Sequence, residues 1–170
     1  LDEFICPYDS FAANTTNDIS DDQLRTWANA VVSQHLALIF DCCYSGGLLE
    51  IVRPNSVGVA ACLENQTAKE CSTLAHGVFT YYLMEALKNT YYLEPAFNAA
   101  KPKVDNHYTA PCPCGPQNCT INDQYGGDYL LWLGLCRTRF NLPHAPGVAP
   151  PTPHEVPVTF KITLHNLELE

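Results

Sequence analysis

Two runs without polar residues, Leu36–Phe40 and Val57–Cys62, are the strongest pattern in the sequence. Because no polar position alternates within them, they are typical of strands covered on both faces in a parallel sheet. Segments with helical character accompany them, at 20–31 and Phe79–Lys88. Strands that alternate with helices predict an α/β fold, with a mostly parallel sheet and helices on both faces.

The clearest helix signal begins at Ser20. This residue is a favourable N-cap, Gln23 follows three positions later as in a capping box, and two aspartates occupy the first turn. The apolar residues recur at i, i+3, i+4 and i+7, so we expect one buried face made of Leu24, Trp27, Ala28 and Val31.

Weaker signals follow toward the carboxyl end. A short helix is predicted from Glu94 to Ala100, because Pro102 discourages its continuation. The apolar residues of Tyr129–Leu133 predict a last strand of the sheet.

The composition changes after residue 136. Residues 137–157 are rich in proline and have no apolar periodicity, as in a linker. Apolar and polar residues then alternate from Val158 to Leu164, which predicts a half-buried strand. We therefore predict a domain over 1–136, a linker over 137–157, and the start of a further β segment or domain over 158–170.

Charge and composition narrow the class of partner. A net charge of −9 argues against nucleic acid and anionic membranes and favours cationic peptides, and no apolar run is long enough to span a bilayer. Nine cysteines, an odd number, leave at least one thiol unpaired within the chain. Together with glycosylation-type triplets, which are common by chance, they lean toward a secreted or lumenal protein; these triplets start at Asn14, Asn65 and Asn118.

Two vicinal cysteines follow the first apolar run, in the stretch Asp41-Cys-Cys-Tyr-Ser-Gly-Gly47. The carboxyl end of a strand in an open α/β sheet is where ligands bind, and glycines allow a sharp turn whose amide N–H groups can face an oxyanion. A cysteine at a strand end is otherwise a small apolar residue that fills the core.

The stretch resembles the nucleophile motif of caspase-like peptidases, Asp-x-Cys-His-Ser-Gly, with Cys43 at the nucleophile position and Tyr44 in place of histidine. Further segments match metacaspases in the same order: Ile5–Asp9, Ala60–Ala68 and His76–Leu83. The resemblance covers roughly 1–133 and implies a caspase-like three-layer sandwich with cysteine endopeptidase activity.

The resemblance also implies roles for individual residues. Cys43 would attack the scissile carbonyl and form a thioester. Asp9, Asp41 and Cys6 match positions at the first specificity pocket, where carboxylates would select a peptide or protein substrate with Arg or Lys at the cleavage site. The alternatives are that Asp9 is a turn residue and that Asp41 caps the end of a strand.

No cofactor is required by this chemistry, but calcium is a possible ligand. Asp21, Asp22 and Glu50 match positions that bind calcium in some metacaspases, and carboxylate oxygens suit that ion. Acidic residues in a first helical turn also occur without any metal.

The catalytic histidine of the family precedes the nucleophile by roughly fifty residues, which would fall before Leu1. His35 lies eight residues before Cys43, roughly 26 Å away along one strand, at the wrong end of the sheet. The chain therefore reads as an incomplete domain that is inactive alone. Strand 36–40 would lack a neighbour, leaving an open edge prone to aggregation.

Two other functions stay open. One is a catalytically inactive caspase-like domain that binds partners through the same pocket. The other is a redox or metal-binding module that uses Cys42 and Cys43, or a cluster of potential zinc ligands. That cluster, which a disulfide-pinned loop explains equally well, consists of His107, Cys112, Cys114 and Cys119.

Overall fold

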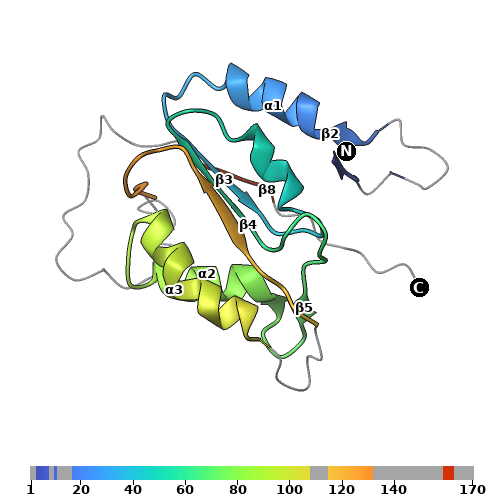
Figure 1. The fold of residues 1–170 in the computed structure, drawn as a ribbon, viewed down its shortest axis with the longest axis vertical. Coiled ribbons are helices and arrows are strands. Elements are labelled where there is room, and N and C mark those ends of the chain that lie inside the picture. The colour runs from blue at the N-terminus through green and yellow to red at the C-terminus, as the bar shows by residue number, and fades with distance from the viewer. Residues whose placement is uncertain (1–2, 8–9, 11–16, 108–114, 132–158, 163–170) are drawn as a thin grey trace.

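A four-stranded mixed sheet lies at the centre of the protein (Figure 1). The computed structural model describes residues 3–7, 10, 17–107, 115–131 and 159–162. The strand order is β7-β4-β3-β8, and β3 pairs in parallel with both β4 and β8, while β7 is antiparallel to β4. The strands are β3 (Leu36–Phe40), β4 (Ser56–Ala60), β7 (Thr120–Asp123) and β8 (Thr159–Ile162).

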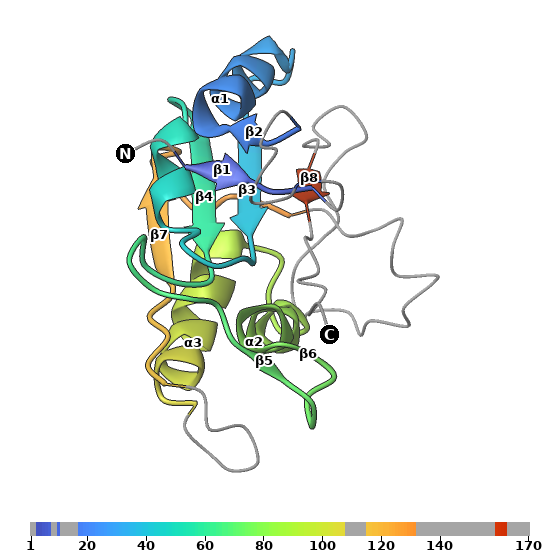
Figure 2. The same ribbon diagram turned by 90° about the vertical axis from the view of Figure 1, so that its right-hand side faces the viewer.

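Helices cover both faces of this sheet (Figures 1 and 2). On one face lie α1 (Asp21–Ala30) and the short 3-10 helix η1 (Gly47–Ile51). On the other lie α2 (Val78–Leu87) and α3 (Leu93–Asp105). The prediction of an α/β fold is confirmed at this level.

Two small antiparallel hairpins lead into the helices. Strands β1 (Phe4–Ile5) and β2 (Ile19–Ser20) pair just before α1, and β5 (Glu70–Cys71) and β6 (His76–Gly77) pair just before α2. They set the direction in which each helix leaves the loops at the sheet.

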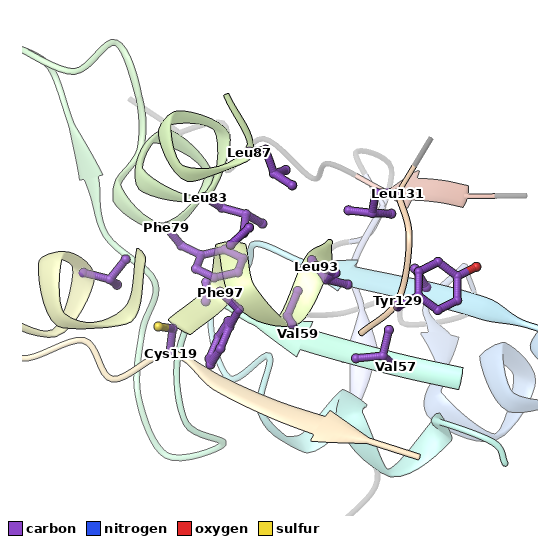
Figure 3. Close-up of a cluster of buried hydrophobic side chains, with 14 of the residues drawn as sticks. Val57, Val59, Phe79, Leu83, Leu87, Leu93, Phe97, Cys119, Tyr129 and Leu131 are labelled. Atoms are coloured by element: carbon purple, nitrogen blue, oxygen red, sulfur yellow. The ribbon is translucent and has the colours of Figure 1, made fainter. Parts of the chain in front are cut away.

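A hydrophobic cluster fills the space on each face. The larger one joins the sheet to α2 and α3 (Figure 3), and its aromatic members Phe79 and Phe97 meet edge to face with ring centroids 6.5 Å apart. The smaller one joins the sheet to α1 and η1 and contains Ile5, Leu24, Phe40, Leu48, Leu49, Ile51, Val52 and Ala60. Each fully buried aliphatic or aromatic side chain contributes about 1.5–3 kcal/mol relative to its exposed state.

The start of α1 is confirmed, but its predicted face is too wide. The Ser20 hydroxyl accepts a hydrogen bond from the Gln23 N–H at 3.2 Å, as an N-cap should. Leu24 and Ala28 are buried, whereas Trp27 is 48% exposed. Since α1 packs mainly on the short η1 and β2, only a narrow stripe of the helix is covered.

The end predicted for the helix at Ala100 is wrong, because α3 continues through Pro102 to Asp105. Pro102 lies on the exposed side of α3, where solvent can satisfy the carbonyl that loses its N–H partner. Val104, one turn beyond Ala100, is buried in the larger cluster and holds this last turn against the sheet.

The structure describes the predicted strand at Tyr129–Leu133 only up to residue 131. In this part, a single isolated bridge joins Leu130 to Tyr92. The edge of the sheet is instead β7, whose sequence Thr-Ile-Asn-Asp carries no apolar run that would have predicted a strand.

The strand predicted from Val158 is confirmed at β8, and it pairs with β3 in the central sheet. The expectation of an open edge beside β3 is therefore wrong, because strands pair with it on both sides. The proposed linker at 137–157 lies outside the described residues, and the division of the chain into domains stays a prediction.

Candidate active site

Cys43 lies in a tight turn just beyond the carboxyl end of β3. Residues 43–46 form hydrogen-bonded turns that lead into η1, and the Gly47 N–H donates to the Tyr44 carbonyl at 3.1 Å. Cys43 is half-buried, so this residue is not enclosed in the core. Tyr44 has a φ of 59°, a left-handed conformation that is rare for a residue with a large side chain and that clusters at functional sites.

A second loop, residues 61–66 at the carboxyl end of β4, braces this turn. The Ser45 hydroxyl accepts a hydrogen bond from the Cys62 N–H at 3.3 Å, and the Tyr44 N–H donates to the Gln66 carbonyl at 2.7 Å. A Cβ atom on Gly46 would lie 2.6 Å from the Glu64 nitrogen, so only glycine permits this approach. The turn that carries Cys43 is therefore held by the neighbouring strand's loop.

Cys42, the first of the two vicinal cysteines, is a poor candidate for the nucleophile. Burial, together with the nearby Cys62, Asp41 and Cys43, raises the pKa of Cys42 to about 12. Burial also raises the pKa of Cys62. Because the thiolate is the nucleophile, these raised values argue against Cys42 as the attacking group. No disulfide joins Cys42 to Cys43.

Asp41 joins the end of β3 to the start of α2. Its Oδ2 accepts hydrogen bonds from the Thr80 N–H at 3.2 Å and from the Thr80 hydroxyl at 2.5 Å. Gly77, the N-cap residue of α2, has no side chain that could accept these bonds, so Asp41 supplies the cap from another element. The alternative prediction gave Asp41 a capping role at the end of its strand, whereas its carboxylate caps the start of α2.

The other two predicted pocket residues belong to the segment after β1. Cys6 is exposed directly beyond that strand, and Asp9 lies outside the described residues. Glu3, just before β1, does reach the nucleophile turn, because a Cβ on Gly47 would lie 2.5 Å from its Oε1.

An acidic group lies on the far side of this turn. Glu3, Asp21 and Glu50 offer ligand atoms that all lie within 4.8 Å of one another, the one such group among the described residues. Asp21 is 4% exposed, and its Oδ1 has no hydrogen-bond partner. A hydrogen bond with Glu50 lowers the pKa of Asp21 and raises the pKa of Glu50.

The predicted calcium ligands are therefore brought together only in part. Asp22 is exposed and pairs with Arg25 at 3.1 Å instead of joining the group, and no sequence pattern pointed to Glu3. Arg25 also pairs with Glu50. Three carboxylates, one of which has a buried oxygen without a hydrogen-bond partner, fit a hard cation such as calcium.

The described histidines occupy different parts of the protein. His35 lies at the opposite end of β3 from Cys43, as predicted, where its Nδ1 is 3.3 Å from the Asn55 carbonyl. His76 precedes Gly77, whose Cβ position is in contact with the Asp41 carboxylate, so β6 reaches the Cys43 end of the sheet. Sequence reasoning assigned no role to His76.

The candidate zinc cluster is not assembled within the described residues. The Nδ1 of His107 is 3.0 Å from the Tyr82 hydroxyl, and burial raises the pKa of Cys119 to about 12, which disfavours the thiolate that zinc binds. Cys112 and Cys114 lie outside the described residues. Cys71 lies in β5, in the hairpin that precedes α2, and is disulfide-bonded.

Sequence reasoning also missed the polar side chains that hold the bracing loop. Gln117 is buried, accepts a hydrogen bond from the Lys69 N–H at 2.8 Å and donates to the Ala61 carbonyl at 2.9 Å. A single glutamine between short loops carries no local signal of such distant partners.

Comparison with known proteins does not assign the chain: no family model matches it, and neither does any curated protein. Among the described helices, none has the length and apolar character needed to cross a bilayer.

Proposed function

We propose that the chain is the nucleophile-bearing part of a caspase-like cysteine endopeptidase domain with a three-layer sandwich architecture. One observation carries this proposal: the half-buried Cys43 follows the carboxyl end of a parallel strand, in a strained turn braced from the next strand. Rigid support for an accessible thiol is what covalent catalysis requires.

In this mechanism the Cys43 sulfur attacks the scissile carbonyl carbon, and the peptide becomes a thioester that water hydrolyses. The negative charge on the carbonyl oxygen needs N–H donors. The Tyr44 N–H is engaged by the Gln66 carbonyl, so it is not available for this purpose. The resemblance of the Asp41–Gly47 stretch to the caspase-like nucleophile motif implies the Cys43 N–H as one such donor.

Cleavage after Arg or Lys is the preference that the charges support. Asp41 lies two residues before Cys43, and the net charge of −9 favours approach of a cationic peptide. The hydrogen bonds from the Thr80 N–H and hydroxyl fix the position of the Asp41 carboxylate.

The general base that the resemblance implies is a histidine upstream of Leu1, because His35 lies at the other end of the sheet and His76 matches no catalytic position of the family. The three carboxylates Glu3, Asp21 and Glu50 are the proposed calcium ligands. Both Glu3 and Glu50 adjoin the nucleophile turn, so bound calcium would stabilise the turn's position.

The test compares this chain with a longer polypeptide that continues the sequence upstream of Leu1. We expect the longer form to hydrolyse Arg- and Lys-ended reporter peptides, and this chain alone to be inactive. Cys43→Ala should abolish turnover, whereas the adjacent Cys42→Ala should leave most of it. Activity that survives Cys43→Ala contradicts the mechanism, and activity of the short chain that His76→Ala removes contradicts the assignment of the base.

The second candidate is a catalytically inactive domain that binds basic peptides through the same pocket. The same longer polypeptide separates this candidate from the peptidase, because an inactive domain would bind Arg-ended peptides without cleaving them.

A further inference from the structure

We infer that Asn65 is an acceptor site for an N-linked glycan. Asn65 begins the triplet Asn65-Gln66-Thr67, whose first asparagine and third hydroxyl are the required groups. The chain has three triplets of this kind, so the triplet alone does not select a site. Two of the three asparagines, Asn65 and Asn118, lie among the described residues, and their surroundings differ.

Asn65 is presented outward by the loop that braces the nucleophile turn. The Gln66 N–H donates to the Leu63 carbonyl at 3.0 Å, which closes a tight turn with Glu64 and Asn65 at its exposed tip. The next side chain points inward, because the Gln66 Oε1 accepts a hydrogen bond from the Asn118 N–H at 3.0 Å. A bulky glycan on Asn65 would therefore project into solvent without displacing the fold.

Asn118 is a poor acceptor by comparison. It is half-buried between the buried residues Gln117 and Cys119, and its own N–H is engaged by Gln66. Its hydroxyl residue Thr120 belongs to β7 and pairs with Ala60 in the sheet. The folded chain leaves little room for a glycan there.

An independent feature agrees with an oxidising compartment, where such glycans are attached. Cys71, six residues after Asn65, is disulfide-bonded, and disulfides persist where the surroundings are oxidising. The thiols of Cys62 and Cys119 are buried, and burial raises their pKa values, which keeps them in the less reactive protonated form.

The modification is the transfer of a glycosyl group to an amide nitrogen. An oligosaccharide moves from a lipid-linked pyrophosphate donor to the Asn65 amide nitrogen. The anomeric C–O bond to pyrophosphate breaks, an anomeric C–N bond forms, and the amide proton leaves with the pyrophosphate. No oxidation or reduction occurs.

The experiment expresses the full chain behind a secretion signal in a eukaryotic host and maps occupied asparagines by peptide mass spectrometry after enzymatic deglycosylation. We expect Asn65 to be occupied in most molecules and Asn118 in few. Asn65→Gln and Thr67→Ala should each abolish the modification at this position, whereas Thr67→Ser, which keeps the hydroxyl, should retain it. Asn118→Gln should leave Asn65 occupancy unchanged. A folded, secreted chain with Asn65 unmodified would overturn the inference, as would preferential occupancy of Asn118.

Discussion

At the scale of single residues, the most informative groups are polar side chains placed where water is excluded. Glu94, in the first turn of α3, is 6% exposed. Its Oε2 accepts a hydrogen bond from the Tyr129 N–H at 2.6 Å, while its Oε1 has no hydrogen-bond partner. Burial is the main cause that raises the pKa of Glu94, and Asp123 and Asp128 add to it. An ionised carboxylate at this position therefore works against folding.

This predicts a pH-dependent effect of Glu94→Gln. A pKa that is raised by folding favours the neutral acid, so this contribution to stability is present in acid and is lost as pH rises through the folded-state pKa. The glutamine stays neutral and keeps an oxygen for the Tyr129 N–H. We expect Glu94→Gln to raise the free energy of unfolding by on the order of 1 kcal/mol at pH 8 and to have little effect at pH 4.

Urea denaturation at both pH values measures this difference. Glu94→Ala is the control, because it removes the hydrogen bond to Tyr129 and should destabilise the chain at both. A glutamine variant that is equally destabilised at pH 4 and pH 8 would contradict the role given to burial.

At the scale of elements, local patterns predict what is locally determined. The apolar runs of β3 and β4 and the Ser20 cap of α1 are encoded in neighbouring residues, and all three are present in the structure. β7 was missed because its pairing with β4, and not its own sequence, makes it a strand. The last turn of α3 was missed because burial of Val104 outweighs the break expected at Pro102.

The candidate site shows the same division. The motif around Cys43 predicted a strand, a thiol and a turn in that order, and these are local. The contacts of Glu3 with Gly47 and of Ser45 with Cys62 join residues far apart in the chain, so no periodicity or spacing could predict them.

The junction between β3 and α2 gives a prediction at this scale. A Cβ on Gly77 would lie 2.5 Å from the Asp41 Oδ2, a distance that forces the carboxylate away from Thr80. We expect Gly77→Ala to lower the free energy of unfolding by about 1–3 kcal/mol through this overlap. Asp41→Ala should cost about 1 kcal/mol by removing the cap of α2.

A double-mutant cycle decides whether the two effects share one cause. In the absence of the carboxylate the new methyl group has space, so Gly77→Ala combined with Asp41→Ala should cost less than the sum of the single changes. Simple additivity, measured by thermal or urea unfolding, would show that the overlap with Asp41 is not what makes glycine necessary.

At the scale of the whole molecule, the acidic group couples three separated segments. Glu3 precedes β1, Asp21 opens α1 and Glu50 belongs to η1, so a cation bound by all three would hold together the elements that cover one face of the sheet. The same η1 continues from the turn that carries Cys43. Binding at this group would therefore affect both the stability of the fold and the position of the nucleophile.

Calcium is accordingly expected to raise the unfolding temperature of the chain. A ligand that binds only the folded state stabilises it by about 2.7 kcal/mol at one hundred times its dissociation constant. The gain should vanish in Asp21→Asn, because this change removes the charge of the buried ligand, and should persist in Asp22→Asn, because Asp22 is exposed and lies outside the group. It should also fade as acid protonates the carboxylates, including Asp21, whose pKa is lowered by its hydrogen bond with Glu50. Differential scanning fluorimetry with calcium, with magnesium and with a chelator measures the effect. Equal stabilisation of the Asp21 and Asp22 variants would assign it to general screening of the acidic surface, and so would an equal response of the native chain to both ions.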